Sequence, residues 1–247
     1  MNHTQIVLEA RGTPGRALGK QRPSFSMTER EIIYPESDGK PMADNTKQFE
    51  WIVKIKEGLE VLFLDDPHVF VAGDLLWYPV RNNNKICAAP DTMVVIGRPK
   101  GDRGSYRQWE EKNIAPQVVF EILSPENTPG EMRKKLEFYE LHGVEEYYLY
   151  DPDRIRFEGW MRSGGLLQPV SGIQGWVSPR LGIRFEITED DLNIFRPDGR
   201  QFLTFLETEA EAQQERQRAE QAETALEQEK RRTAELEAKL KDLGLLQ

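Results

Sequence analysis

Residues 90–97 read PDTMVVIG, and residues 116–125 read PQVVFEILSP. Both contain a short apolar run rich in β-branched residues, and a glycine or a proline ends each run, which is the pattern of buried strands covered on both faces. Asp91 stands at the mouth of the first strand, and Glu121 lies inside the second. The two stretches therefore predict a central sheet with one carboxylate on each of two strands.

Glu121 stands among apolar neighbours, so its carboxylate needs a partner. Residues two apart on a strand share a face, and Glu121 therefore points the same way as Val119 and Leu123. An unpaired charge in such a place costs on the order of several kcal/mol. A divalent cation shared with Asp91 would supply the partner, because hard cations such as Mg²⁺ or Mn²⁺ prefer carboxylate oxygens.

The segment after the second strand has the end signals of a helix. Residues 128–131, TPGE, read as a capping box with proline at the first helical position, and Gly143 suits the C-terminal stop. Lys135 lies at the edge of the apolar stripe of this helix and can extend its ammonium group toward Glu121. Two carboxylates and a lysine from neighbouring elements form a minimal metal-dependent phosphodiesterase site. The stripe consists of Met132, Leu136 and Tyr139.

An ordered series of short motifs resembles the Uma-type putative restriction endonuclease family, which is similar to the PD-(D/E)XK nuclease superfamily. The likeness runs from about Tyr34 to Glu186, as one core domain would. The series comprises Pro90-Asp91, Glu121-Ile122-Leu123-Ser124-Pro125, Lys135, Tyr139, Gly143-Val144, Glu146-Tyr147-Tyr148 and Asp151-Pro152.

The resemblance implies an α/β, restriction-endonuclease-like core with a mixed sheet and Mg²⁺- or Mn²⁺-dependent cleavage of DNA. Asp91 and Glu121 would be the metal ligands, and Lys135 would be the catalytic lysine. The superfamily pattern has its lysine two residues after the glutamate, where this chain has Leu123. The family explanation is that the lysine has moved to the following helix, which fits Lys135.

Two further acidic residues are weaker site candidates. Residues 44–46 can cap a helix that runs to about residue 64, and Glu50 lies on it. Related nucleases often bring an acidic residue from a first helix to the metal, although a solvated surface carboxylate is the alternative for Glu50. Asp74 interrupts the strand pattern of residues 69–80 and reads as a turn residue or a neighbour of the site.

The loop between the two site strands, residues 98–109, is glycine-rich and basic, with aromatic residues interleaved. It is called the basic loop below. Such a loop suits contacts to a phosphate backbone and base stacking, and a plain surface loop is the alternative. The net charge of −9 argues against a protein that grips nucleic acid over its whole surface, but a local basic strip suffices. We expect DNA as the partner, with RNA not excluded. The candidate contacts are Arg98, Lys100, Arg103 and Arg107.

The chain divides into a basic N-terminal arm (1–33), a core (34–200) and a helical tail (201–247). Further strands are expected near residues 145–150, 155–170 and 181–185. Residues 207–243 contain no glycine or proline and predict one long helix, either a marginal coiled coil that joins two or more subunits or a solvated helix. The a positions are Phe205, Ala212, Ala219, Leu226, Thr233 and Leu240, and the d positions are Thr208, Glu215, Ala222, Glu229, Leu236 and Leu243.

The sequence leaves two alternatives to an active nuclease. The charged residues can form a structural ion-pair network, or the chain can be an inactive relative that acts as a binding or assembly module through its tail. Cys87, the single cysteine, fits a reducing cytoplasm. No apolar run approaches the length of a membrane span, and the N-terminus lacks a signal-peptide core, so we expect a cytoplasmic protein without a membrane partner.

Overall fold

The computed structural model describes residues 32–39 and 41–242; the basic arm expected over residues 1–33 lies outside them up to residue 31. The helices are α1 (Thr46–Leu62), α2 (Pro129–His142) and α3 (Phe205–Asp242). The strands are β1 (Val69–Ala72), β2 (Trp77–Tyr78), β3 (Thr92–Ile96), β4 (Tyr106–Arg107), β5 (Val118–Ile122), β6 (Glu146–Asp151), β7 (Arg156–Ser163), β8 (Leu166–Pro169), β9 (Arg184–Ile187) and β10 (Leu192–Phe195).

Six strands of the described ranges form one mixed sheet in the order β1-β3-β5-β6-β7-β8. β3 pairs antiparallel with both β1 and β5, β5 pairs parallel with β6, and β7 and β8 continue antiparallel. The parallel step between β5 and β6 is the one that α2 crosses, as such connections require. The predicted mixed α/β fold is confirmed, and β3 and β5 are central strands.

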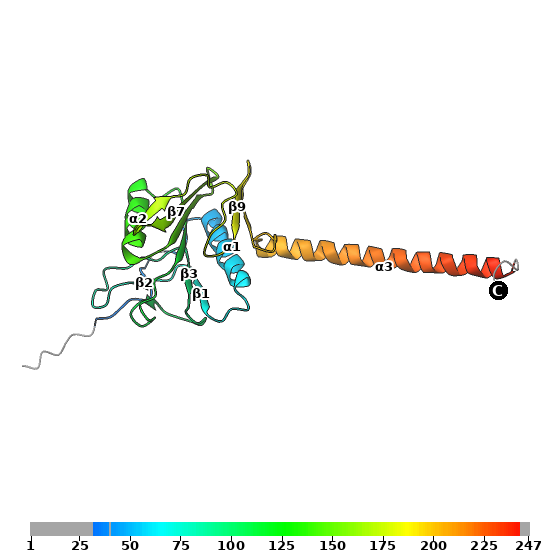
Figure 1. Cartoon of the computed structure of the whole chain (residues 1–247), viewed down its shortest axis with the longest axis horizontal. Helices are drawn as coiled ribbons and strands as arrows, with labels where there is room; N and C mark the ends of the chain where they lie inside the picture. The colour runs from blue at the N-terminus through cyan, green and yellow to red at the C-terminus, as the bar shows by residue number, and fades with distance from the viewer. Residues whose placement is uncertain (1–31, 40, 243–247) are drawn as a thin grey trace, which may run out of the picture. The chain divides into compact units, whose positions relative to one another are not determined.

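The two faces of the sheet belong to different cores, because successive residues of β3 and β5 point to opposite sides. Figure 1 shows α1 and α2 on opposite sides of the sheet. The core on the α1 side, which the β9–β10 hairpin also covers, includes Ile55, Val94, Val118, Phe120 and Phe185. The core on the α2 side includes Met93, Val95, Val119 and Tyr139.

Local signals fix the ends of α1 and α2. The Asn45 side chain accepts a hydrogen bond from the backbone N–H of Gln48, at 2.8 Å, and so caps α1. Thr128 and Glu131 form the predicted capping box of α2, and Gly143 ends that helix with a left-handed φ of 95°. These caps place Lys135 in the second turn of α2, over the sheet face that carries Val119.

The structure differs from the sequence prediction at three strands. The run at residues 69–80 is divided into β1 and β2, because Asp74 adopts a positive φ of 47° between them. The basic loop contains β4, which pairs parallel with β2. β10, which pairs with β9, was not predicted at all.

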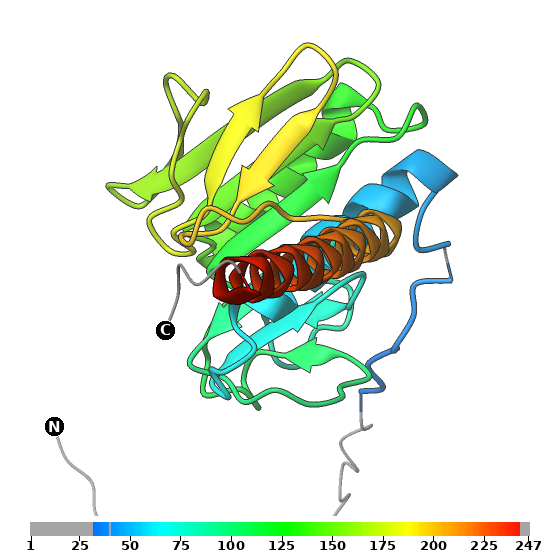
Figure 2. The same cartoon turned by 90° about the vertical axis from the view of Figure 1, so that its right-hand side faces the viewer.

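α3 begins with a capping box of its own. The backbone N–H of Thr204 donates to Glu207 Oε2 at 2.7 Å, and the backbone N–H of Glu207 donates to the Thr204 hydroxyl at 3.3 Å. The helix runs for 38 residues and has no buried residue; Figure 2 looks along it. The predicted long helix is confirmed, while the coiled coil and the domain boundaries remain predictions. Among the helices of residues 32–39 and 41–242, none is long and apolar enough to span a membrane.

Candidate functional site

Asp91 and Glu121 face each other across β3 and β5. The antiparallel register sets Thr92 opposite Phe120, and one step further along the same register Asp91 comes opposite Glu121. Both side chains therefore lie on the α2 face of the sheet. The backbone N–H of Ile122 donates to Asp91 Oδ2 at 2.7 Å, which ties the start of β3 to the end of β5.

Glu121 is held by two side chains of α2. Lys135 Nζ lies 2.6 Å from Glu121 Oε2, and the Tyr139 hydroxyl donates to Glu121 Oε1. Only 2% of the Glu121 side chain is exposed, whereas 32% of the Lys135 side chain is. The lysine thus connects a buried carboxylate with the solvent side of the cluster. The structure brings Asp91, Glu121 and Lys135 together, although their catalytic roles remain a prediction.

The electrostatics of the cluster show excess negative charge. Burial raises the pKa of Asp91 well above its usual range, and the neighbouring charge of Glu121 raises it further. Burial lowers the pKa of Lys135, but the carboxylates of Glu121 and Asp91 outweigh that effect, so the pKa is raised and the ammonium form is favoured. One ammonium group is therefore shared by two carboxyl groups.

Asp74 is an outer neighbour of the cluster. Its backbone N–H donates to the carbonyl of Pro90 at 3.1 Å, one residue before Asp91. Burial raises the pKa of Asp74, the charges of Asp38 and Glu121 add to the increase, and Lys135 opposes it. Asp74 is thus both the turn residue and the site neighbour that the sequence allowed.

Two tyrosines belong to this site, and the sequence reasoning assigned neither a polar role. Tyr139 was assigned to the apolar stripe, although its place four residues after Lys135 puts both on one helix face. Tyr147, on β6, is 1% exposed, and its hydroxyl has no hydrogen-bond partner in the described part of the chain. The rings of Tyr139 and Tyr147 lie 5.3 Å apart. Burial raises the pKa of Tyr147, with the charges of Glu121 and Asp91 adding to it.

The acidic residues of the site fit a magnesium-type cation only if other ligands complete its shell. Over residues 32–39 and 41–242, no three His, Cys, Asp or Glu side chains form a group that could hold a metal ion. Asp91 and Glu121 are thus the two carboxylates available as metal ligands. Mg²⁺ is usually bound through one or two carboxylates, with waters and substrate phosphate as its remaining ligands. A cation here would also offset the repulsion that raises the pKa of Asp91.

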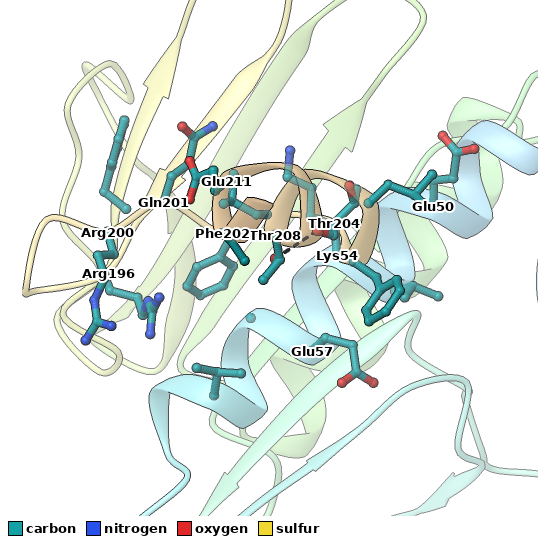
Figure 3. A pocket seen from close by; sticks show the side chains of 18 of the residues that line it. Glu50, Lys54, Glu57, Arg196, Arg200, Gln201, Phe202, Thr204, Thr208 and Glu211 are labelled. Atoms are coloured by element: carbon teal, nitrogen blue, oxygen red, sulfur yellow. Dashed lines mark hydrogen bonds between the residues drawn. The ribbon is translucent and has the colours of Figure 1, made fainter. Parts of the chain in front are cut away.

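Glu50 does not lie beside Asp91 and Glu121. It is exposed on α1, which covers the sheet face opposite to that of Glu121. Together with Lys54 it lines a hollow of about 920 Å³ between α1, residues 195–204 and the first turns of α3, which Figure 3 shows. The structure therefore does not bring Glu50 to the carboxylate cluster.

Arg98 and Arg103 of the basic loop hold the loop together. Both donate through Nε to Glu111, at 2.6 and 2.7 Å, and each of the two side chains is 12% exposed. The Arg103 guanidinium also lies 3.9 Å from the centre of the Phe70 ring. Two guanidinium groups share one carboxylate, so this cluster keeps one net positive charge (2 − 1).

The other two cations of the loop also have partners within the chain. Lys100 donates to the carbonyls of Phe63 and Leu64, beyond the end of α1. Arg107 lies 3.6 Å from a carboxylate oxygen of Glu110. Base stacking by Tyr106 is excluded, because that side chain is 0% exposed and belongs to the core beneath α2. Nucleic-acid contact by the four basic residues remains a prediction.

The fold and the cluster together define a class of protein: an α/β domain whose central strands hold two carboxylates beside a lysine, groups suited to acid–base and phosphoryl chemistry. The chain belongs to the Uma2 family, described as "Putative restriction endonuclease", which matches residues 60–194. That range contains Asp91, Glu121 and Lys135, whereas Glu50 and α3 lie outside it.

One solved structure that is similar to this chain is that of a putative nuclease belonging to DUF820 from Anabaena variabilis ATCC 29413. The two chains are 17% identical, the match covers 57% of this chain and 74% of that one, and the TM-score is 0.42. No curated protein matches this chain.

Proposed function

We propose that this protein is a metal-dependent endonuclease that hydrolyses phosphodiester bonds of DNA. The observation that carries the proposal is the contact between Lys135 and Glu121 directly beside Asp91, on neighbouring central strands. Membership of the Uma2 family supports the same reaction class. We prefer DNA to RNA because the family description refers to restriction, although the hydrolytic chemistry is shared by both.

Each residue of the cluster has a chemical task in this proposal. Asp91 and Glu121 would hold Mg²⁺ or Mn²⁺, which when bound supplies Lewis-acid stabilisation and an activated water. Lys135, the partly exposed member, orients the attacking water or stabilises charge on the phosphate. Tyr139 holds Glu121 Oε1 and so fixes the carboxylate on the α2 face of the sheet.

DNA would approach through local positive charge, since the net charge of the chain is −9. The loop with Arg98, Lys100, Arg103 and Arg107 keeps positive charge after its internal pairing and is the proposed strip for phosphate contacts. Binding through a few cations predicts modest affinity that weakens as salt rises, with a slope limited by the small number of phosphates that are neutralised. A cytoplasmic location suits such a reaction and also suits the free thiol of Cys87.

The test is nicking of supercoiled plasmid in Mg²⁺ or Mn²⁺, with EDTA as the metal-free control. Lys135→Gln should lower the rate at least 100-fold, the order of loss seen when one transition-state donor is removed. Lys134→Gln is the matched control, because Lys134 is the adjacent exposed lysine. Equal rates for the two variants would contradict the role of Lys135, and no nicking by the unchanged protein on any nucleic acid would contradict the function.

One observation favours the alternative of an inactive fold relative. Both oxygens of Glu121 already have protein partners, as they would in a purely structural ion-pair network. In that case the chain would act as an assembly module through its tail, and it would neither bind a divalent cation nor nick DNA.

A further inference from the structure

α3 presents a long surface that the other residues of the ranges 32–39 and 41–242 leave uncovered. None of its 38 residues is buried. A helix in a protein is normally stabilised by packing of its apolar stripe rather than by its own hydrogen bonds. Leu226, Leu236 and Leu240 are 56%, 52% and 39% exposed, and all three occupy a or d positions of one heptad register. The stripe that should be covered is thus the a/d seam.

We propose that α3 pairs with α3 of a second copy of this chain in a parallel, in-register coiled coil. The proposal does not depend on whether the Asp91 cluster is catalytic. The second copy is the chosen occupant because the charges that flank the seam complement each other when two identical helices run in the same direction.

The flanking e and g positions carry this argument. In a parallel pair each g residue lies across from the partner's e residue of the next heptad. Three of these combinations join opposite charges, and the fourth sets Ala225 beside Lys230, so none joins like charges. The three attractive combinations are Glu211 with Arg216, Arg218 with Glu223, and Arg232 with Glu237.

The antiparallel alternative brings like charges together. In the antiparallel register of fullest overlap, which sets Ala219 opposite Glu229, e residues flank e residues of the other helix. Arg216 then meets Lys230, Glu209 meets Glu237, and Glu223 meets its own copy. Like-charged neighbours of this kind destabilise helix pairs and select against this register. The antiparallel register shifted by one heptad joins opposite charges, but it sets Leu240 opposite Gln201, before the start of α3, and so leaves part of the seam uncovered.

The hollow beside the first turns of α3 lies on the same seam. The first a and d residues, Phe205, Thr208, Ala212 and Glu215, all line it. The α1 wall of the hollow, where Figure 3 labels Glu50, Lys54 and Glu57, also carries exposed apolar residues. A partner helix that followed the seam would therefore extend into the hollow and cover apolar surface of α1 as well. The residues of that surface are Phe49, Val53 and Val61, which are 46%, 38% and 49% exposed.

Two glutamates limit the strength of this pairing. Glu215 and Glu229 occupy d positions, where leucine is favoured in a parallel dimer. The residues next to them, Arg216 and Lys230, are at e positions and would border the holes that receive these glutamates from the partner. The charge is thereby partly offset, and a dimer of modest affinity that weakens in high salt is expected.

The direct test is disulfide trapping of the full-length chain with Cys87→Ser as background. In the proposed dimer Ala219 meets Ala219 of the second copy at an a position, so Ala219→Cys should be trapped as a covalent dimer under mild oxidation. Glu220→Cys, at the neighbouring outward-facing b position, is the control and should not form a covalent dimer. In the two antiparallel registers Ala219 faces a d residue, Glu229 or Ala222, so an antiparallel dimer would leave Ala219→Cys unlinked. No linkage, or equal linkage of both variants, would overturn the proposal.

A second measurement keeps the test independent of introduced cysteines. In sedimentation equilibrium, the double variant Glu215→Leu/Glu229→Leu should dimerise at least tenfold more tightly than the unchanged chain. The matched control is Glu220→Leu/Glu227→Leu, which removes the same charge and adds the same side chains at b positions. A monomer for all three chains, or equal tightening by both double variants, would also refute the paired seam. So would an assembly larger than a dimer.

Discussion

Replacing Asp91 by asparagine should stabilise the metal-free protein, although it removes a residue of the candidate site. The amide oxygen of asparagine can still accept the hydrogen bond that Ile122 N–H donates to Asp91 Oδ2 at 2.7 Å. The negative charge opposite Glu121 disappears. When replacement of a residue raises the stability of the fold, the natural residue is one that serves function at a cost in stability.

The magnitude follows from the cross-strand geometry. Side chains directly opposite in an antiparallel pair have Cβ atoms about 5 Å apart, and two like charges at that separation repel by ~3 kcal/mol at an effective dielectric constant of about 20. Loss of the attraction between Asp91 and Lys135 cancels part of this gain, while relief of the burial of the charge adds to it. We expect a net stabilisation of ~1–2 kcal/mol, or roughly 2–8 °C in Tm for a domain of this size.

The assay is thermal unfolding in EDTA at several pH values. Because the folded pKa of Asp91 is raised, ionisation of its carboxyl group costs stability as pH rises above the unfolded value of about 4. The advantage of Asp91→Asn should therefore be present at pH 7 and vanish near pH 3.5. If the variant instead unfolds several degrees lower at pH 7, Asp91 is a satisfied structural partner and the reasoning fails.

Three further predictions concern carboxylates of the candidate site and of the basic loop. Glu121→Gln should destabilise the fold by about 2 kcal/mol in urea unfolding, because it weakens the hydrogen bonds of a lysine and a buried tyrosine; an effect no larger than that of exposed Glu126→Gln would count against this network. Cation affinity should rise with pH until the pH passes the raised pKa of Asp91 in the folded protein, because that carboxyl group must lose its proton, and calorimetry in buffers of different ionisation enthalpy should detect proton release; a pH-independent affinity would contradict this prediction. Glu111→Gln should lower the free energy of unfolding in urea by about 1–3 kcal/mol, because two arginines lose their carboxylate partner, whereas Glu110→Gln, at a 57% exposed side chain, should be nearly neutral. Equal effects of the two variants would refute the stabilising role of Glu111.

The elements that position the site could be predicted because their signals are local. The apolar runs of β3 and β5 and the capping box of α2 each lie within a few residues. The reach of Lys135 toward Glu121 followed from helix periodicity and strand alternation alone. What local signals could not supply was the pairing register that sets Asp91 opposite Glu121, since strand partners are chosen by long-range packing.

The remaining differences between the sequence prediction and the structure concern residue types that suit two different environments. Tyr139 fits an apolar stripe as well as a carboxylate, and only the position of β5 beneath α2 distinguishes the two uses. The arginines of the basic loop suggest an open surface, yet Glu111, which lies 13 and 8 residues after Arg98 and Arg103, accepts hydrogen bonds from both of them. The heptad pattern of α3 is visible in the sequence, but the helix proposed to pair with it belongs to a second copy of the chain.

The central claim is that Asp91 and Glu121 together bind a divalent cation, and titration calorimetry with Mn²⁺ tests it most directly. The titration would be made on the unchanged chain and on Asp91→Asn, each with and without a short DNA duplex, since substrate phosphate can supply a ligand. We predict binding to the unchanged chain, at least with the duplex present, and its loss in a variant that is folded and more stable. Equal binding by both proteins, or no binding by either with the duplex present, would contradict the claim.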